Sequence, residues 1–429
     1  MSNQNKTSLG LFINLSLMMF VLFFVWGAWF VTVGAFMVNR GMDSHIGWVY
    51  STTPIAAIVT PFFMGVFADR FMNAEKLQGL LMILSGVFIA IAPQFASPEK
   101  ADMFFYILLA HALCFMPNLG LSNTICLKHL SDTERDYPIV RVFATLGWIV
   151  AGLVVSKVLK ADLKEIQFYV AAGAAFTVGI YSFFLPKTPP PAKGKKVSFG
   201  DIIGAATVPY FKKFSFAVFM FASLFACVAF MPYWANGATF LGAAGIKEPG
   251  AFLTMGQMAE LFILAFVLPI FIKRFGIKWT MILGMASWIL RFLLFAYAAK
   301  FLAANPEAKV LPMLVAGVIL HGFAYDFVFV SGYLYVDKHV DEEVRAQAQG
   351  LLTVFTQGIG FVLSSQIFAG ALYLKIVGTE GGLNEWKLFW LCPMAYLGVV
   401  FFLFLIFFRE DKPVASDPPA EDQPEPTSA

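Results

Sequence analysis

Charged residues are scarce in this sequence. Only 13% of the 429 residues are Asp, Glu, Lys or Arg, whereas 59% are hydrophobic. A typical soluble domain carries roughly 25% charged residues. The composition therefore excludes an ordinary soluble domain and predicts an integral membrane protein embedded in a lipid bilayer. We expect no nucleic-acid partner.

Cysteine and the usual catalytic motifs are also scarce. The four cysteines, Cys114, Cys126, Cys227 and Cys392, lie within apolar runs and lack metal-type spacing, so we interpret them as packing residues. The chain contains no G-x-x-x-x-G-K-[ST] phosphate loop, no H-E-x-x-H and no G-x-S-x-G. We therefore expect neither an enzyme nor an ATP-driven pump, and no cofactor or metal.

Long apolar runs dominate what the sequence does contain. A helix needs about 20 apolar residues to cross the ~30 Å hydrocarbon layer. Twelve runs of about this length occur, at residues 10–38, 46–68, 77–96, 103–127, 138–159, 166–186, 212–241, 250–272, 279–300, 309–336, 345–374 and 386–408. The sequence predicts an all-α integral membrane protein with twelve transmembrane helices.

A Pro- and Lys-rich segment, PKTPPPAKGKKVSFG at residues 186–200, separates the first six runs from the last six. Two internal echoes support a repeat: ADRF follows the second run and IKRFG the eighth, and HALCFMPN in the fourth run resembles HGFAYDFV in the tenth. Two parallel six-helix repeats around a central cavity are typical of major facilitator transporters. The larger share of the Lys and Arg residues lies on the side of the amino terminus, which favours two cytoplasmic termini.

These features predict four regions. They are an N-terminal six-helix half at residues 1–186, a cytoplasmic linker at 187–211, a C-terminal six-helix half at 212–409 and a disordered, Pro-rich and acidic cytoplasmic tail at 410–429.

The loop GVFADRFMNAEKL, residues 65–77, resembles the signature loop between the second and third helices of major facilitator transporters. Gly65, Asp69 and Arg70 match that signature, whereas its second glycine and its following basic pair are missing. The resemblance implies a conformational role for the loop rather than substrate contact.

Two helical stripes carry polar residues inside apolar runs. Gln257 and Glu260 are three residues apart and share one helix face. They suit a ligand rich in hydroxyls and ring nitrogens, although a hydrogen bond between packed helices is an open alternative. Arg141, Thr145 and Trp148 form a second stripe at positions i, i+4 and i+7. For Arg141 the alternative is a side chain that extends to the membrane interface.

The stretch HGFAYDFVFVSGYLYV, beginning at His321, places ionisable residues where hydrocarbon is expected, at a cost of at least ~2.5 to 3.5 kcal/mol for an acidic or basic side chain at the bilayer centre. His321 and Tyr325 share one face, whereas Asp326 is rotated by about 140° from His321 and lies under Tyr333. The first face is a candidate ligand surface. A structural hydrogen bond for His321 and a structural pair for Asp326 remain alternatives, and Arg291 is the candidate partner for a buried carboxylate.

Aromatic residues make up 17% of the chain, and Trp26, Trp29, Phe30 and Val33 line one face of the first helix. Most such aromatics pack against helices or face lipid. A few could stack on a planar ring.

Taken together, the sequence resembles the nucleoside:proton symporter family of the major facilitator superfamily from the first run to the last. The segments that carry the likeness, in order, are WGAWFVTVGAFM, VYSTTPIAA, FMPNLGLSNTI, FGIKWTMILGMASWILRFLLFAY and VRAQAQG. The resemblance implies import of nucleosides, driven by the proton gradient, through alternating access of the two halves.

The resemblance also implies roles for individual residues. It assigns nucleoside contacts to Arg141, Thr145, Gln257, Glu260 and Tyr325, with the acidic Asp326 beside them and Trp148 in place of a phenylalanine. The chain departs from well-known relatives at two places. Met231 and Trp234 stand where those relatives have two amides, leaving Asn236 as the only amide of AFMPYWANGATF, and His321 stands where they have tyrosine.

Our functional hypothesis is a multi-pass, proton-coupled nucleoside importer of a bacterial inner (cytoplasmic) membrane that works as a monomer. Glu260 is the favoured proton-coupling residue because it shares its helix face with Gln257, and His321 and Asp326 are the other candidates. One alternative is a proton-coupled carrier of another small polar solute, such as a modified nucleoside, a sugar or a cell-wall fragment. A membrane receptor that binds ligand without transport is another.

Overall fold

A computed structural model describes residues 7–63, 72–190, 200, 204–378 and 381–410, and every regular element in these ranges is helical. The expected all-α class is therefore confirmed for the described chain. Gly65, Asp69 and Arg70 of the expected signature loop lie outside the described residues. So do residues 191–199 and 201–203 of the expected linker and residues 411–429 of the expected tail.

The helices before residue 190 form the first group. They are α1 (Leu9–Gly27), α2 (Val33–Asn39), η2 (Asp43–His45), α3 (Ile46–Phe63), α4 (Ala74–Ile91), η4 (Ala92–Phe95), η5 (Pro98–Lys100), α5 (Ala101–Phe115), α6 (Pro117–His129), α7 (Thr133–Gly152) with the π-helical turn η6 (Leu153–Val158), and α8 (Ile166–Ser182).

The helices after residue 204 form the second group. They are η7 (Ala205–Lys212), α10 (Phe214–Cys227), α11 (Met231–Ala243), α12 (Pro249–Phe262), η8 (Ile263–Val267), α13 (Leu268–Ala304), α14 (Leu311–His339), α15 (Glu342–Thr353), η9 (Val354–Gly360), α16 (Phe361–Ser364), η10 (Ser365–Leu372), α17 (Tyr373–Ile376) and α18 (Leu383–Phe407).

Nine segments of the described chain are long and apolar enough to cross a membrane. One of them, Pro249–Ala304, contains two of the runs expected from the sequence. Within α13 the backbone leaves the helical region at Gly276, where φ is 76°, a conformation that glycine adopts far more readily than other residues. The break falls between residues 272 and 279, where the sequence predicts the end of one run and the start of the next.

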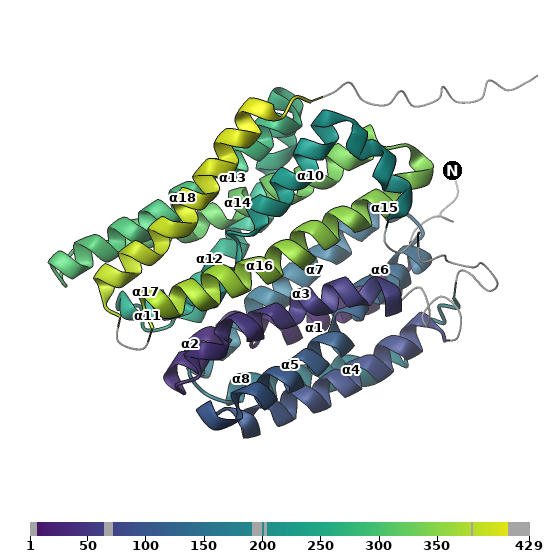
Figure 1. The fold of residues 1–429 in the computed structure, drawn as a ribbon. Helices are drawn as coiled ribbons and strands as arrows, with labels where there is room; N and C mark the ends of the chain where they lie inside the picture. The colour runs from purple at the N-terminus through teal and green to yellow at the C-terminus, as the bar shows by residue number, and fades with distance from the viewer. Residues whose placement is uncertain (1–6, 64–71, 191–199, 201–203, 379–380, 411–429) are drawn as a thin grey trace, which may run out of the picture.

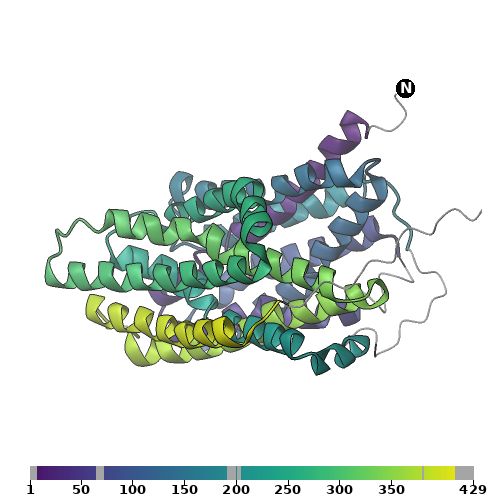
Figure 2. The ribbon, with the colours of Figure 1, turned by 90° about the horizontal axis from the view of Figure 1, so that it is seen from above.

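The two groups lie side by side, with the purple and blue helices of the first group on one side and most teal, green and yellow helices of the second on the other (Figure 1). Seen from above, the long helices of both groups run roughly along the same direction (Figure 2). Within the first group α1 and α7 cross closely. A Cβ at Gly147 would lie 2.0 Å from the Phe20 carbonyl oxygen, and one at Gly27 would lie 2.9 Å from the Trp148 Cα. Glycine at both positions lets α7 place its polar stripe beside α1.

The groups meet at the end where α1 turns into α2. A Cβ at Gly34 in α2 would lie 2.0 Å from the Ala235 carbonyl oxygen in α11, so the two backbones touch. The Tyr50 hydroxyl donates to the Phe30 carbonyl at 2.8 Å and also lies 3.2 Å from the Trp234 carbonyl oxygen, and Gln366 Nε2 donates to Ser51 Oγ at 2.8 Å. These contacts between groups close this end of the bundle, which we call the closed end.

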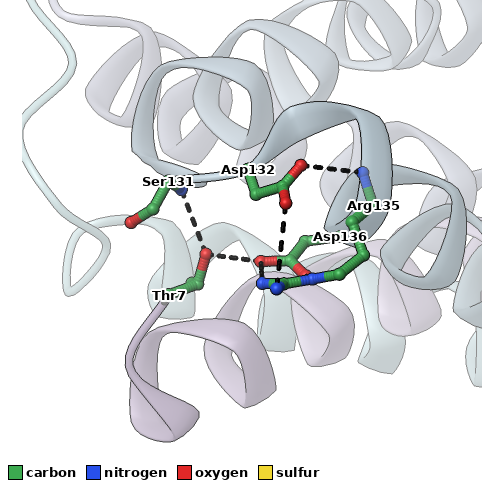
Figure 3. A network of polar contacts seen from close by, with 5 residues as sticks. All are labelled: Thr7, Ser131, Asp132, Arg135 and Asp136. Carbon is green, nitrogen blue, oxygen red and sulfur yellow. Dashed lines mark hydrogen bonds and ion pairs between the residues drawn. The ribbon is translucent and has the colours of Figure 1, made fainter. Parts of the chain in front are cut away.

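At the other end of α1, a polar network joins residues of the first group (Figure 3). Thr7 Oγ1 donates to Asp136 Oδ2 at 2.6 Å and accepts from the Ser131 amide at 3.0 Å. Arg135 Nε donates to Asp136 Oδ1 at 2.7 Å, and the Arg135 amide is capped by Asp132. The network ties the start of α1 to the start of α7 without involving the second group.

Candidate functional site

A cavity of about 160 Å³ lies between the two groups of helices. Its walls come chiefly from α1, α3 and α7 on one side and from α11, α12, α14, η9 and α16 on the other. The lining residues are Phe23, Trp26, Phe30, Thr53, Pro54, Ala57, Met116, Arg141, Thr145, Trp148, Phe230, Met231, Trp234, Gln257, Glu260, His321, Tyr325, Gln357 and Phe361. All seven residues that the sequence suggests for substrate binding are among them.

Aromatic side chains form much of the wall. Trp148 lies edge-on to Trp26 and to Trp234, with ring centroids 5.2 and 5.6 Å away, and Phe30 bridges to Trp234 at 6.0 Å. Rings from both groups of helices thus meet at one place. Aromatic faces and edges at this spacing suit a planar ring system as ligand.

Arg141 lines the cavity from α7. Its guanidinium carbon lies 4.5 Å from the centre of the Phe23 ring, a cation–π contact. Thr145 and Trp148 follow it along the same helix face and also line the cavity. The arginine therefore faces the cavity rather than only the membrane interface.

Gln257 and Glu260 enter the cavity from α12. Gln257 is 4% exposed, and its Nε2 has no hydrogen-bond partner among the described residues. The Glu260 side chain is 17% exposed, and its Oε2 lies 3.6 Å from His321 Nε2. The two helices approach closely here because Gly322 in α14 has no side chain, since a Cβ would lie 2.7 Å from the Glu260 Cα.

The partner of Arg291 differs from the sequence interpretation. Arg291 Nη2 lies 3.2 Å from His321 Nδ1, Nε donates to the Gly317 carbonyl at 3.1 Å, and the guanidinium lies 4.1 Å from the centre of the Tyr233 ring. Within the described ranges, Arg291 forms no ion pair with a carboxylate. Arg291 and His321 are each 1% exposed, so this contact is buried.

Asp326 lies apart from the cavity. It is 1% exposed, is not a lining residue, and its Oδ2 has no hydrogen-bond partner in the described chain. Tyr333, on the same face of α14, shares a hydrogen bond with Thr353 Oγ1 at 2.8 Å and accepts one from Gln357 Nε2 at 3.3 Å. The angular separation of His321 and Asp326 on the helix therefore places them in different surroundings.

Sequence reasoning missed two polar residues of the wall, Thr53 and Gln357. Gln357 is one of four glutamines in the expected run at residues 345–374, and nothing in the sequence shows which of them faces the cavity. Thr53 lies among other small hydroxyl residues in VYSTTPIAA, and nothing in that pattern shows which of them faces the cavity. In the described residues no group of three His, Cys, Asp or Glu side chains is arranged to hold a metal ion.

Comparison with known proteins decides the family. The model of the family described as "Nucleoside H+ symporter" matches residues 9–413. The chain belongs to the nucleoside H+ symporter family. The family confirms the resemblance expected from the sequence, and it makes this chain a multi-pass membrane transporter rather than an enzyme.

Individual relatives agree with the family over almost the whole chain. The putative nucleoside transporter YegT of Escherichia coli (strain K12) is 36% identical over 92% of this chain and 93% of its own, and the xanthosine permease of the same organism is 34% identical over 92% and 94%. The crystal structure of the nucleoside transporter NupG superposes with a TM-score of 0.83 at 28% identity, covering 94% of this chain and 100% of that one.

Proposed function

We propose that this symporter-family chain imports nucleosides together with protons across the inner membrane of a bacterium by alternating access. The observation that carries the proposal is the shared cavity, where Glu260 and Gln257 of the second group face Arg141 and Thr145 of the first. A site built from both groups is remade whenever they rock against each other, as alternating access requires.

The residues divide into two kinds of contact. Trp26, Trp148 and Trp234 offer faces and edges for a nucleobase. Gln257, with an unpaired donor, and Arg141 offer hydrogen bonds for ribose hydroxyls and base heteroatoms. Tyr325 and His321 complete the wall on α14. This division suits a ligand with one planar aromatic end and one hydroxyl-rich end.

Glu260 is the proposed proton-coupling residue. Its carboxylate reaches the cavity, whereas Asp326 is sealed from it. A carboxylate that takes up a proton in the cavity removes a charge before the carrier reorients, which avoids moving an uncompensated charge through a low-dielectric core. His321 and Asp326 are the less favoured sites.

For topology we propose twelve spans in two six-helix halves, residues 1–186 and 212–409, with a cytoplasmic linker, a cytoplasmic tail and both termini in the cytoplasm. The bias of Lys and Arg toward the side of the amino terminus supports this orientation. With that orientation the closed end faces outward and the cavity opens toward the cytoplasm. The cavity is complete within one chain, which supports a monomer as the working unit in the bilayer.

One observation favours a second candidate, a proton-coupled carrier of a different polar solute such as a modified nucleoside, a sugar or a cell-wall fragment. Met231 and Trp234 line the cavity on α11, at positions where the family resemblance implies amides. A wall with fewer amides and an added indole and imidazole suits a different base or ring.

The test is uptake into proteoliposomes of a mixed panel of nucleosides, bases and sugars, read by mass spectrometry. With an alkaline lumen we expect accumulation of a nucleoside against its gradient, abolished by an uncoupler. Accumulation of a sugar but no nucleoside would favour the second candidate. Sodium-dependent uptake that survives the uncoupler would contradict proton coupling.

The proton site is tested by Glu260→Gln, which keeps the shape of the side chain and cannot titrate. We expect this variant to retain exchange of nucleoside between equal pools but to lose proton-driven accumulation. Asp326→Asn should instead damage folding or both activities together. Parental accumulation by Glu260→Gln would exclude Glu260 as the required proton site.

A further inference from the structure

The contact between Arg291 and His321 restricts where the imidazole can hold its hydrogen. A guanidinium has only donors and stays protonated in proteins. Arg291 Nη2 lies 3.2 Å from His321 Nδ1, within hydrogen-bond distance, so Nδ1 must be the acceptor. A neutral imidazole that accepts at Nδ1 carries its hydrogen on Nε2.

The surroundings of His321 hold it in this orientation. Its ring stacks on Tyr233 at 5.1 Å and meets Trp234 edge-on at 5.1 Å. Gly256 in α12 makes room for it, because a Cβ there would lie 3.1 Å from the His321 Cβ. These contacts fix the plane of the ring. Within that plane the Arg291 guanidinium selects the flip that turns Nδ1 toward it, because the opposite flip would present a C–H to the cation.

The titratable groups that face His321 come from four helices. They are Arg291 on α13, Glu260 on α12, Tyr233 on α11 and Tyr325 on α14, while Arg141 of α7 lines the same cavity. Arg291 is the only one of these five in hydrogen-bond contact with Nδ1. A second proton on His321 would have to sit on Nδ1, directly against that cation.

The Nε2 hydrogen points to the side of the ring where Glu260 lies. The Nε2 to Oε2 distance of 3.6 Å is longer than the 2.7 to 3.2 Å of an ordinary N–H···O bond. This N–H is therefore not committed to Glu260, and His321 lines the cavity. Protonation makes Glu260 a weaker hydrogen-bond acceptor, so an acceptor atom of the ligand then binds the His321 N–H more readily than Glu260 does.

We propose that Arg291 is a positioning residue that fixes His321 as the neutral tautomer protonated on Nε2, and that this N–H selects nucleosides whose base presents an oxo group. The selection of a base rests on the proposed function; the tautomer does not. His321 then contributes to ligand specificity, and a group other than His321 carries the transported proton. A base with an amino group at the same ring position would place its N–H donor against the His321 N–H donor, which disfavours its binding.

The tautomer is tested by nitrogen NMR of protein labelled with 15N-histidine in lipid bilayers. The chain has 5 histidines, and the His321 signals are assigned by their loss in His321→Phe. We expect a single neutral form with hydrogen on Nε2 between about pH 5 and pH 8, the range in which an ordinary histidine changes charge. A doubly protonated ring, or hydrogen on Nδ1, would overturn the assignment.

The role of Arg291 is tested with three variants on α13. Arg291→Met should yield mixed tautomers or a doubly protonated ring, whereas Arg291→Lys keeps a cationic donor and should preserve the parental signal. Arg274→Met removes an exposed arginine of the same helix and should change nothing at His321. If Arg291→Met does not fold, the Arg291→Lys variant still tests the proposal. Loss of the parental His321 signal in a folded Arg291→Lys protein would show that a cationic donor at position 291 is not sufficient to fix the tautomer.

Selection of the base is tested by binding of two pairs that differ by oxo or amino at one ring position, inosine with adenosine and uridine with cytidine. We expect the parent to prefer the oxo member. His321→Phe should weaken binding of the oxo member by roughly 5- to 150-fold and should not weaken binding of the amino member, because it removes the donor that opposes the amino group. Equal weakening of the binding of both members would overturn the proposed role of His321 in selecting the base. Failure to bind any nucleoside would overturn the proposed function and the reading of a base with it, while the NMR result stands independently.

Discussion

The closed end should open when a methyl group is added at Gly250, the second residue of α12. A Cβ at this position would lie 2.8 Å from Asp162 Oδ1, 2.8 Å from Thr32 Cγ2 and 3.0 Å from Ser156 Cβ. All three neighbours belong to the first group of helices, whereas α12 belongs to the second. The clash in Gly250→Ala therefore exists only while the two groups are together at this end.

The size of the effect follows from these distances. Carbon atoms attract most at about 3.5 to 4.0 Å, so the contacts with the Thr32 and Ser156 carbons would be strongly repulsive before relaxation. The 2.8 Å contact with the Asp162 oxygen is also too short for a Cβ. Overpacking of this kind typically costs about 1 to 3 kcal/mol. Because the cost falls only on the closed arrangement, the ratio of open to closed should rise by roughly 5- to 150-fold.

The native contacts explain why the space is so tight. The Gly250 amide donates to Asp162 Oδ2 at 3.2 Å, and Ser156 Oγ donates to the same oxygen at 2.7 Å. The carboxylate thus lies against the amino-terminal end of α12, where exposed N–H groups favour an acceptor. A side chain larger than hydrogen at Gly250 would push the acceptor away from its donor.

The assay measures the distance between spin labels at Lys164 and Glu307, exposed positions near the closed end in the first and second groups. We expect a new, longer component in Gly250→Ala. Gly242→Ala is the matched control, because it lies in α11 of the second group and a Cβ there has no atom within 4 Å. A parental distance distribution in a folded Gly250→Ala protein would refute the reasoning that this packing holds the end closed.

Three further predictions concern other contacts. Burial raises the pKa of the Asp162 carboxyl above its ordinary 3.8, so the closed arrangement binds a proton more tightly than an open arrangement in which this carboxyl is hydrated. Acidification toward pH 3.8 should therefore increase the closed fraction in the spin-label assay. Asp162→Asn should abolish this pH dependence. Gln257→Ala should weaken ribonucleoside binding by roughly 5- to 150-fold in calorimetry, and Arg141→Ala should impair uptake by a folded protein. Thr7→Val removes two hydrogen bonds of the network in Figure 3. It should lower the free energy of unfolding by about 1 to 3 kcal/mol without changing the distance between the spin labels at the closed end.

The parts of the cavity that could be predicted from sequence are those that depend on one helix alone. Helical periodicity groups Arg141, Thr145 and Trp148, and it groups Gln257 with Glu260, whatever the neighbouring helices do. The same periodicity separates His321 from Asp326. The structure places the first residues on the cavity wall and Asp326 outside it.

The parts that could not be predicted depend on contacts between helices. Arg291 and His321 are 30 residues apart, and their contact depends on how α13 packs on α14. From composition alone, a carboxylate was the natural partner for a buried arginine, because opposite charges compensate each other. The sequence shows no distances, so it cannot show that an imidazole occupies the place next to the guanidinium.

The position of His321, rather than a carboxylate, beside Arg291 affects how a proton can be exchanged in the cavity. An arginine in direct contact with Glu260 would favour its charged form and oppose protonation. In the structure the imidazole of His321 stands between them, 3.2 Å from Arg291 and 3.6 Å from Glu260. Arg291 therefore orients the wall without forming a salt bridge to the acid, and Glu260 keeps its access to the cavity. The buried arginine and the proposed proton site can coexist because a neutral side chain separates them.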